Sequence, residues 1–218
     1  MKSMLKNPVL VLVFSVFLAF IASYPAFWLV NSEYIEKNSL SFLYIADLSA
    51  LLIMFILPLG IITYIYKENM REFGLRYPEN PKLATKMSLL VVLVLLPIIY
   101  WLSKTSSFDK YYSIEQGFGS YFLLATLGSA VYFIGEEFLF RGFLFFGLWE
   151  KLKFHSFWII NIIFAIIHIG KPALEVLFAF VAGLMFTYLS YRTKSFIPAV
   201  IVHFVIALIL NIFVIISR

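Results

Sequence analysis

The chain has 218 residues, of which 62% are hydrophobic and only 13% are charged, and its formal net charge is +5. A soluble domain of this size needs a more polar surface, so the composition predicts an all-α protein, a polytopic transmembrane helix bundle. Long apolar runs, rather than short alternating segments, argue against an outer-membrane barrel. Because the sequence has no cysteine, disulfides, thiolate metal ligands and a cysteine nucleophile are also excluded.

The apolar runs predict about seven membrane spans, the first of them a retained span rather than a cleaved signal peptide. In chain order, the predicted spans cover residues 8–30, 40–66, 87–102, 119–149, 155–169, 173–191 and 196–216. Pro58 is expected to interrupt the second span. The fourth is too long for one span and too short for two: its helix either continues to Trp149 or breaks at Gly135 or Gly142, which would allow it. We divide the chain into N-terminal transmembrane helices, residues 1–105, and a helical core, residues 118–216.

Most basic residues lie in loops that the span count places on the same side of the membrane as the N-terminus. The positive-inside rule then predicts a cytoplasmic N-terminus for an integral protein of a bacterial-type plasma membrane. The positive charge is spread over short loops, so it indicates membrane orientation and attraction to anionic lipids, with no nucleic acid as a partner.

An acidic pair lies inside one of the most apolar stretches of the chain. Glu136 and Glu137 occur in the fourth predicted span, and Arg141 follows four residues after the second of them. One charge inside a membrane costs roughly 2.5 kcal/mol or more, so three charges require a polar network or a wet cavity. Helical spacing predicts an ion pair between Glu137 and Arg141, with Glu136 about 100° away around the helix. This pair is equally well explained as a buried structural ion pair, whereas Glu136 is placed to act as a general base.

Two histidines lie inside later predicted spans, His168 at the end of the fifth and His203 in the seventh. Imidazoles inside spans usually face the bundle interior, where most of them serve in packing or hydrogen bonding. We expect Asn161 and Asn211 to face the interior for the same reason. Because one carboxylate and two imidazoles come from three helices, the sequence predicts that Glu136 and the two histidines converge on one water. Glu136 would remove its proton, while the histidines orient it or stabilise an oxyanion.

Three motifs in this order resemble those of the CPBP family of CAAX-prenyl-protease type 2 and bacteriocin-processing, Abi-like membrane proteases. They are Glu136-Glu137-Phe-Leu-Phe-Arg141, Phe164-x-x-x-His168 and, in the third motif position, His203. The resemblance covers about residues 119–211 and implies a multi-helix intramembrane endopeptidase with a water-filled catalytic cavity. It also implies a peptide or membrane-protein substrate, cleaved near the lipid bilayer.

Transferred by position, the resemblance implies that Glu136 and His168 activate the water and that His203 binds the oxyanion. The supporting residues it implies are Glu137, Arg141 and Phe164.

The chain departs from the family pattern at one position. The third motif has Asn or Asp four residues after its His, and this chain has Ala207 there. Loss of an oxyanion donor costs roughly 3 kcal/mol in the transition state, and Asn211 lies about 12 Å from His203 along the helix. The alternative is therefore a non-catalytic CPBP-like membrane protein, acting in bacteriocin immunity or as a regulatory scaffold.

Other chemistries fit the sequence less well. The motifs of site-2 zinc proteases, aspartyl intramembrane proteases and serine hydrolases do not occur. A metal-free glutamate mechanism is preferred, and zinc held by Glu136, His168 and His203 is its rival. A transporter that uses the carboxylates as a proton relay is disfavoured because no pair of broken spans is repeated.

Overall fold

The computed structural model is all-helical and describes residues 7–22, 24–34, 39–112 and 119–217. Two helices precede the second predicted span, α2 (Pro8–Ile21) and α3 (Tyr24–Asn31). That span is formed by α4 (Leu40–Ala50) and its continuations η1 (Leu51–Ile56), α5 (Leu57–Gly60) and η2 (Ile61–Tyr66). The rest are η3 (Met70–Phe73), α6 (Pro81–Ser103), α7 (Ser106–Tyr111), α8 (Ser120–Glu137), η4 (Phe138–Leu144), α9 (Phe145–Leu152), α10 (His155–Ile166), α11 (Ala173–Thr193) and α12 (Ile197–Ile216).

Five helices among the described residues are long and apolar enough to cross a membrane, so the predicted number of seven is wrong. They are Leu40–Tyr66, Pro81–Ser103, Ser120–Leu152, Ala173–Thr193 and Ile197–Ile216. The first predicted span is divided between α2 and α3, where Pro25 disfavours continuation of the preceding turn. The fifth is only the 12-residue α10, about 18 Å long, against a hydrocarbon core of about 30 Å. Hydropathy alone did not reveal these helix ends.

The interruption expected at Pro58 does not occur, and the fourth span takes the continuous form of its two alternatives. Around Pro58 the chain remains helical and widens to π-helix on both sides, in η1 and η2, which accommodates the missing N–H of the proline. The fourth span continues without a break through η4, another π-helical segment. Its glycines serve close packing instead: a Cβ at Gly135 would lie 2.5 Å from the Ala50 carbonyl oxygen, and one at Gly142 would lie 2.7 Å from the Phe138 ring.

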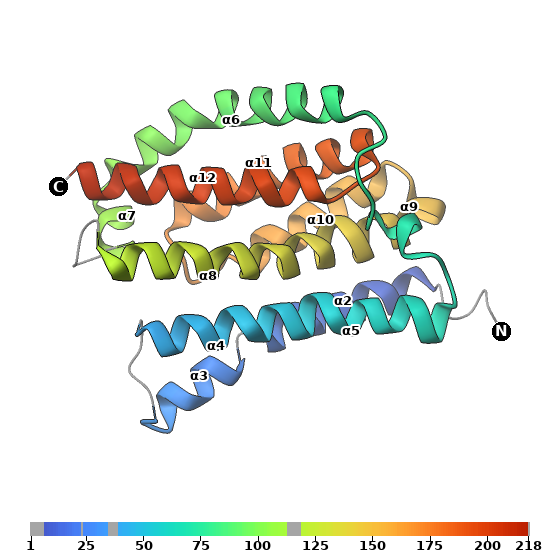
Figure 1. Cartoon of the computed structure of the whole chain (residues 1–218), viewed down its shortest axis with the longest axis horizontal. Helices are drawn as coiled ribbons and strands as arrows, with labels where there is room; N and C mark the ends of the chain where they lie inside the picture. Colours follow the sequence, from blue (N-terminus) through green and yellow to red (C-terminus); the bar gives the residue numbers. More distant parts are fainter. Residues whose placement is uncertain (1–6, 23, 35–38, 113–118, 218) are drawn as a thin grey trace.

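The long helices run side by side, with α12 between α6 and α8 and with α4 packed on the other side of α8 (Figure 1). Helix α11 contacts α6, α10 and α12. Buried phenylalanines of η4, among them Phe138, Phe140 and Phe143, form the centre of the apolar core. This packing places the end of α8 and the start of η4 among α10, α11 and α12, so the acidic pair lies in the middle of the bundle.

Candidate active site

The acidic pair ends α8, and the π-helical turn of η4 follows immediately. Single π-helical turns inside α-helices are rare and occur frequently at functional sites, because they change the direction in which the following side chains point. Glu136 is 3% exposed, and Glu137 and Arg141 are fully buried. Three ionisable groups are therefore held at the centre of the bundle, where each requires a partner.

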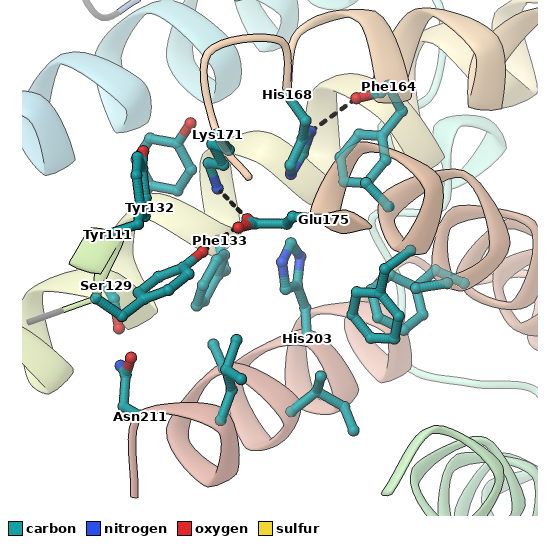
Figure 2. Close-up of a pocket in the computed structure, with 18 of the residues that line it drawn as sticks. Tyr111, Ser129, Tyr132, Phe133, Phe164, His168, Lys171, Glu175, His203 and Asn211 are labelled. Carbon is teal, nitrogen blue, oxygen red and sulfur yellow. Dashed lines mark hydrogen bonds and ion pairs between the residues drawn. The ribbon is translucent and has the colours of Figure 1, made fainter. Parts of the chain in front are cut away.

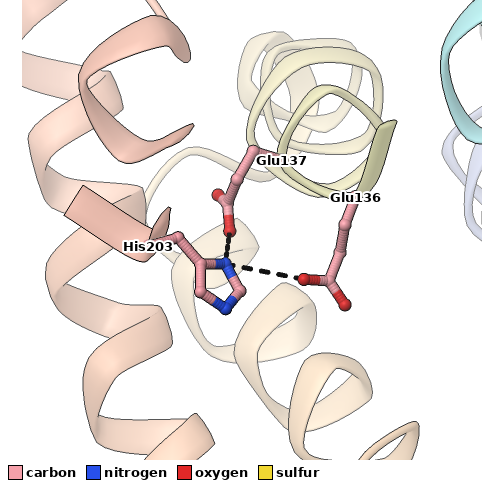
Figure 3. A group of neighbouring side chains, drawn as sticks. All are labelled: Glu136, Glu137 and His203. Atoms are coloured by element: carbon pink, nitrogen blue, oxygen red, sulfur yellow. Dashed lines mark hydrogen bonds and ion pairs between the residues drawn. The ribbon is translucent and has the colours of Figure 1, made fainter. Parts of the chain in front are cut away.

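Both carboxylates face His203 of α12 (Figure 3). Nδ1 of His203 lies 2.7 Å from Oε1 of Glu137 and 3.5 Å from Oε2 of Glu136. Because a carboxylate accepts hydrogen bonds, Nδ1 is the protonated nitrogen that donates to Glu137. The sequence predicted that Glu136 and His203 would meet. It did not predict that Glu137 would contact the histidine more closely.

The predicted ion pair between Glu137 and Arg141 is present, with 3.2 Å between Arg141 Nη1 and Glu137 Oε1. Arg141 also donates from Nη2 to Oδ1 of Asn161 at 3.4 Å, and its guanidinium lies 4.0 Å from the centroid of the Phe164 ring. Nδ2 of Asn161 donates in turn to Thr187 at 3.1 Å. Asn161 therefore faces the interior as predicted, and this chain of contacts compensates the buried guanidinium across α10 and α11.

Gly183 of α11 makes room for this network, because a Cβ there would collide with Oδ1 of Asn161 and lie 3.0 Å from Arg141 Nη2. Thr187 and Gly183 were missed at the sequence level. They lie one turn apart on α11, but nothing in that local pattern indicates which helix they face.

His168 lies just beyond the end of α10, in the turn before α11. Its Nδ1 is 2.7 Å from the carbonyl oxygen of Phe164, which can only accept, so Nδ1 carries a proton. Burial, assisted by the charge of Lys171, lowers the pKa of His168 to about 2, so the ring is neutral. Its Nε2 is then a hydrogen-bond acceptor with a defined direction, suited to holding a water or a metal ion.

A cavity of about 340 Å³ joins the two histidines (Figure 2). Its wall includes His168, His203 and Tyr132, and it extends along α12 past Ala207 to Asn211. The Tyr132 hydroxyl donates a long hydrogen bond, 3.5 Å, to Oε1 of Glu136. His168 and His203 therefore face one hollow, whereas Glu136, the third member of the predicted group, is not among the described residues that line it. Tyr132 was missed, although its position four residues before Glu136 could have indicated it.

A second polar group, also missed, closes one side of this cavity. Nζ of Lys171 lies 2.9 Å from Oε1 of Glu175, and the Tyr112 hydroxyl donates to the same oxygen at 2.6 Å. Burial raises the pKa of Tyr112 well above its usual range, which keeps this hydroxyl a donor. The Tyr112 bond connects the residue that follows α7 to α11 across the cavity wall. Figure 2 shows the ion pair between Lys171 and Glu175 on that wall.

The donor set can also be compared with that of a metal site. One ligand atom each from Glu136, Glu137 and His203 lies within 4.8 Å of the others, and His168 is not in this group. Oε2 of each glutamate is buried without a hydrogen-bond partner. Two carboxylates and an imidazole suit a divalent cation such as zinc, whereas the predicted rival set contained His168 in place of Glu137.

These observations define a polytopic helical membrane protein with a buried glutamate, arginine and histidine cluster beside a cavity. Residues 118–209 match the family described as Type II CAAX prenyl endopeptidase Rce1-like, so the chain contains a domain of this family. The resemblance drawn from the three motifs is thereby confirmed. No curated protein and no solved structure gives a significant match.

Proposed function

We propose that the protein is an intramembrane endopeptidase that hydrolyses a peptide bond near the membrane surface. The main support is the convergence of Glu136, Glu137 and His203 within 4.8 Å, next to a cavity that His168 and His203 line. Buried ionisable groups beside a cavity are the usual signature of a catalytic site, and the family match points to peptide hydrolysis.

In this proposal Glu136 is the general base and His168 helps to hold the attacking water. The water donates one hydrogen bond to Nε2 of His168, the acceptor left free by the Nδ1 bond to Phe164. Glu136 takes the other proton as the water oxygen bonds to the peptide carbonyl carbon. The same proton then passes to the leaving amine nitrogen, which breaks the carbon–nitrogen bond and restores Glu136.

His203 would stabilise the oxyanion from Nε2, the nitrogen that Glu137 does not use. Donation from both nitrogens requires the cationic ring, whose charge the two adjacent carboxylates would offset. Ala207 offers no donor, although it lines the cavity. The Tyr132 hydroxyl is a further donor on the wall, and its 3.5 Å bond to Glu136 is long enough to be exchanged for one to substrate.

Substitution of the base tests this proposal most directly. Glu136→Gln keeps the shape of the side chain and removes its basicity, so peptide cleavage in detergent or liposomes should fall by about a hundredfold or more. Glu79→Gln, which changes an exposed carboxylate paired with Arg76, is the matched control and should cleave like the parent. Parental cleavage by a folded Glu136→Gln variant would eliminate Glu136 as the base.

A zinc-dependent mechanism is a second candidate, favoured by the buried Oε2 atoms of Glu136 and Glu137, which accept no hydrogen bond from the described residues. These carboxylates and His203 would hold the ion, which when bound would polarise the substrate carbonyl and the water. The Arg141 charge beside Glu137 opposes a cation there, so we rank this candidate second. Stoichiometric zinc in the purified protein, lost in Glu136→Gln, together with chelator-sensitive cleavage, would reverse that ranking.

The third candidate is a non-catalytic relative that binds a peptide in the same cavity, and Ala207 is the observation that favours it. If the parent binds peptides but cleaves none, Ala207→Asn should restore cleavage by supplying a donor one turn from His203. Binding without cleavage in both proteins would favour the scaffold.

A further inference from the structure

The cavity beside His168 and His203, where the reaction is proposed to occur, is called the catalytic cavity below. It opens into a second hollow of about 240 Å³ that the proposed reaction does not use. Both hollows are lined by Leu43, Tyr111, Tyr112, Ser129 and Asn211. Figure 2 shows Ser129, Tyr111 and Asn211 gathered at one end of the catalytic cavity, away from Phe164. The second hollow therefore continues the catalytic cavity between α4, α8 and α12.

Asp47 of α4 lines this second hollow and is only 9% exposed. Its Oδ2 is buried and has no hydrogen-bond partner, and none of the ion pairs between described residues includes it. Every other buried carboxylate near the cavity has a basic side chain as a neighbour: Glu137 has Arg141, Glu136 has His203 and Glu175 has Lys171. Burying a carboxylate without a partner costs free energy, so binding of a cation is expected to be most favourable at Asp47.

The helix facing Asp47 is shaped to receive it. Gly128 of α8 lies directly against the carboxylate, and a Cβ there would collide with Oδ2. The Thr126 hydroxyl, on the wall of the same hollow, is also buried without a partner. Three features therefore converge here: an uncompensated acid, a spare hydroxyl and open volume.

We propose that this hollow is a specificity subsite that binds the cationic side chain of a lysine or arginine in the peptide substrate. This inference rests on the proposed peptidase function, because it makes the second hollow an extension of the same binding cleft. From His203 to Asn211, where the second hollow begins, the catalytic cavity follows α12 for about 12 Å by helix rise. An extended peptide covers that distance in about three to four residues, which sets the position of the basic residue relative to the cleaved bond.

Binding can be measured separately from cleavage by using the full-length Glu136→Gln variant in detergent. The probes are fluorescent peptides of leucine and alanine that carry a single Arg at successive positions, each matched by a peptide with Gln or Glu there. We expect one position at which Arg improves affinity over Gln by about tenfold or more, as a charge-assisted hydrogen bond does. Asp47→Asn added to this protein should remove that preference, and Asp47→Lys should replace it with a preference for Glu.

The control is Glu79→Gln in the same background, which alters an exposed acid in the loop before α6 and should keep the Arg preference. The proposal is overturned if no position favours Arg, a result that needs no Asp47 variant to fold. It is equally overturned if folded Asp47→Asn keeps the preference. Absence of cleavage by the parent, with the Arg preference intact, would count against the peptidase and not against this subsite.

Discussion

A buried polar network links η4, α10 and α11 through Arg141, Asn161 and Thr187, whereas the buried serine of α2 bonds within its own helix. Arg141 reaches from η4 to Glu137, and to Asn161 of α10. Ser15 of α2 donates to the Val11 carbonyl oxygen one turn earlier, at 2.7 Å. A local bond of this kind forms wherever the helix forms, but a cross-helix network is satisfied only in the assembled bundle. Polar groups that bond across helices are therefore satisfied only when the bundle, and with it the candidate site, is assembled.

The largest effect should follow from removing the cation of the network. Arg141→Met keeps most of the volume and leaves Glu137 without its arginine, so unfolding free energy should fall by about 3–5 kcal/mol. Arg192→Met is the matched control, because Arg192 is exposed and its hydrogen bond goes to the Tyr188 hydroxyl of the same helix; it should change stability by less than about 0.5 kcal/mol. Unfolding of both variants in mixed micelles measures the difference. An Arg141→Met protein as stable as the parent would show that the network is not needed for assembly.

A smaller effect is expected where α8 approaches α4. Gly135→Ala introduces a Cβ 2.5 Å from the Ala50 carbonyl oxygen, so the helices must separate, at a cost of about 1–3 kcal/mol. Gly60→Ala is the counterpart in the N-terminal helices: its backbone is α-helical and nothing lies within 4 Å of the added Cβ. It should be neutral or stabilise by about 0.5–1 kcal/mol. Equal losses in the two variants would contradict the close approach at Gly135.

The parts of the site that sequence could predict are those set by local geometry. The Glu137–Arg141 pair follows from helical spacing alone, and it forms even though the helix widens to a π-turn there. The apolar runs located most of the membrane helices, but they did not indicate that α2 and α10 end early. Hydropathy describes the free energy of transferring a residue from water to an apolar environment, and it carries no information on where a helix ends.

The unpredicted parts depend on how helices meet. The local sequence does not indicate that Glu137 lies closer to His203 than Glu136 does. It also does not indicate that Asp47 packs against Gly128. Both arrangements are fixed by close contact between α8 and its neighbours α4 and α12. Sequence order supplied the residues of the candidate site, while helix packing determined their partners.

The smallest predicted difference in unfolding free energy is between two hydroxyls, one bonded to a neighbouring helix and one bonded within its own helix. Thr187→Ala removes a partner of Asn161 on a neighbouring helix, while Nδ2 of Asn161 keeps its 2.7 Å bond to the Phe157 carbonyl oxygen. The loss in unfolding free energy should therefore be about 1 kcal/mol, the usual value of one hydrogen bond. Ser15→Ala removes a hydroxyl that bonds only its own helix, and it should cost less than about 0.5 kcal/mol. Unfolding curves recorded side by side in one detergent decide the matter. If the serine variant loses as much as the threonine variant, bonding across helices has no special weight in this bundle, and Arg141 would have to act through its charge alone.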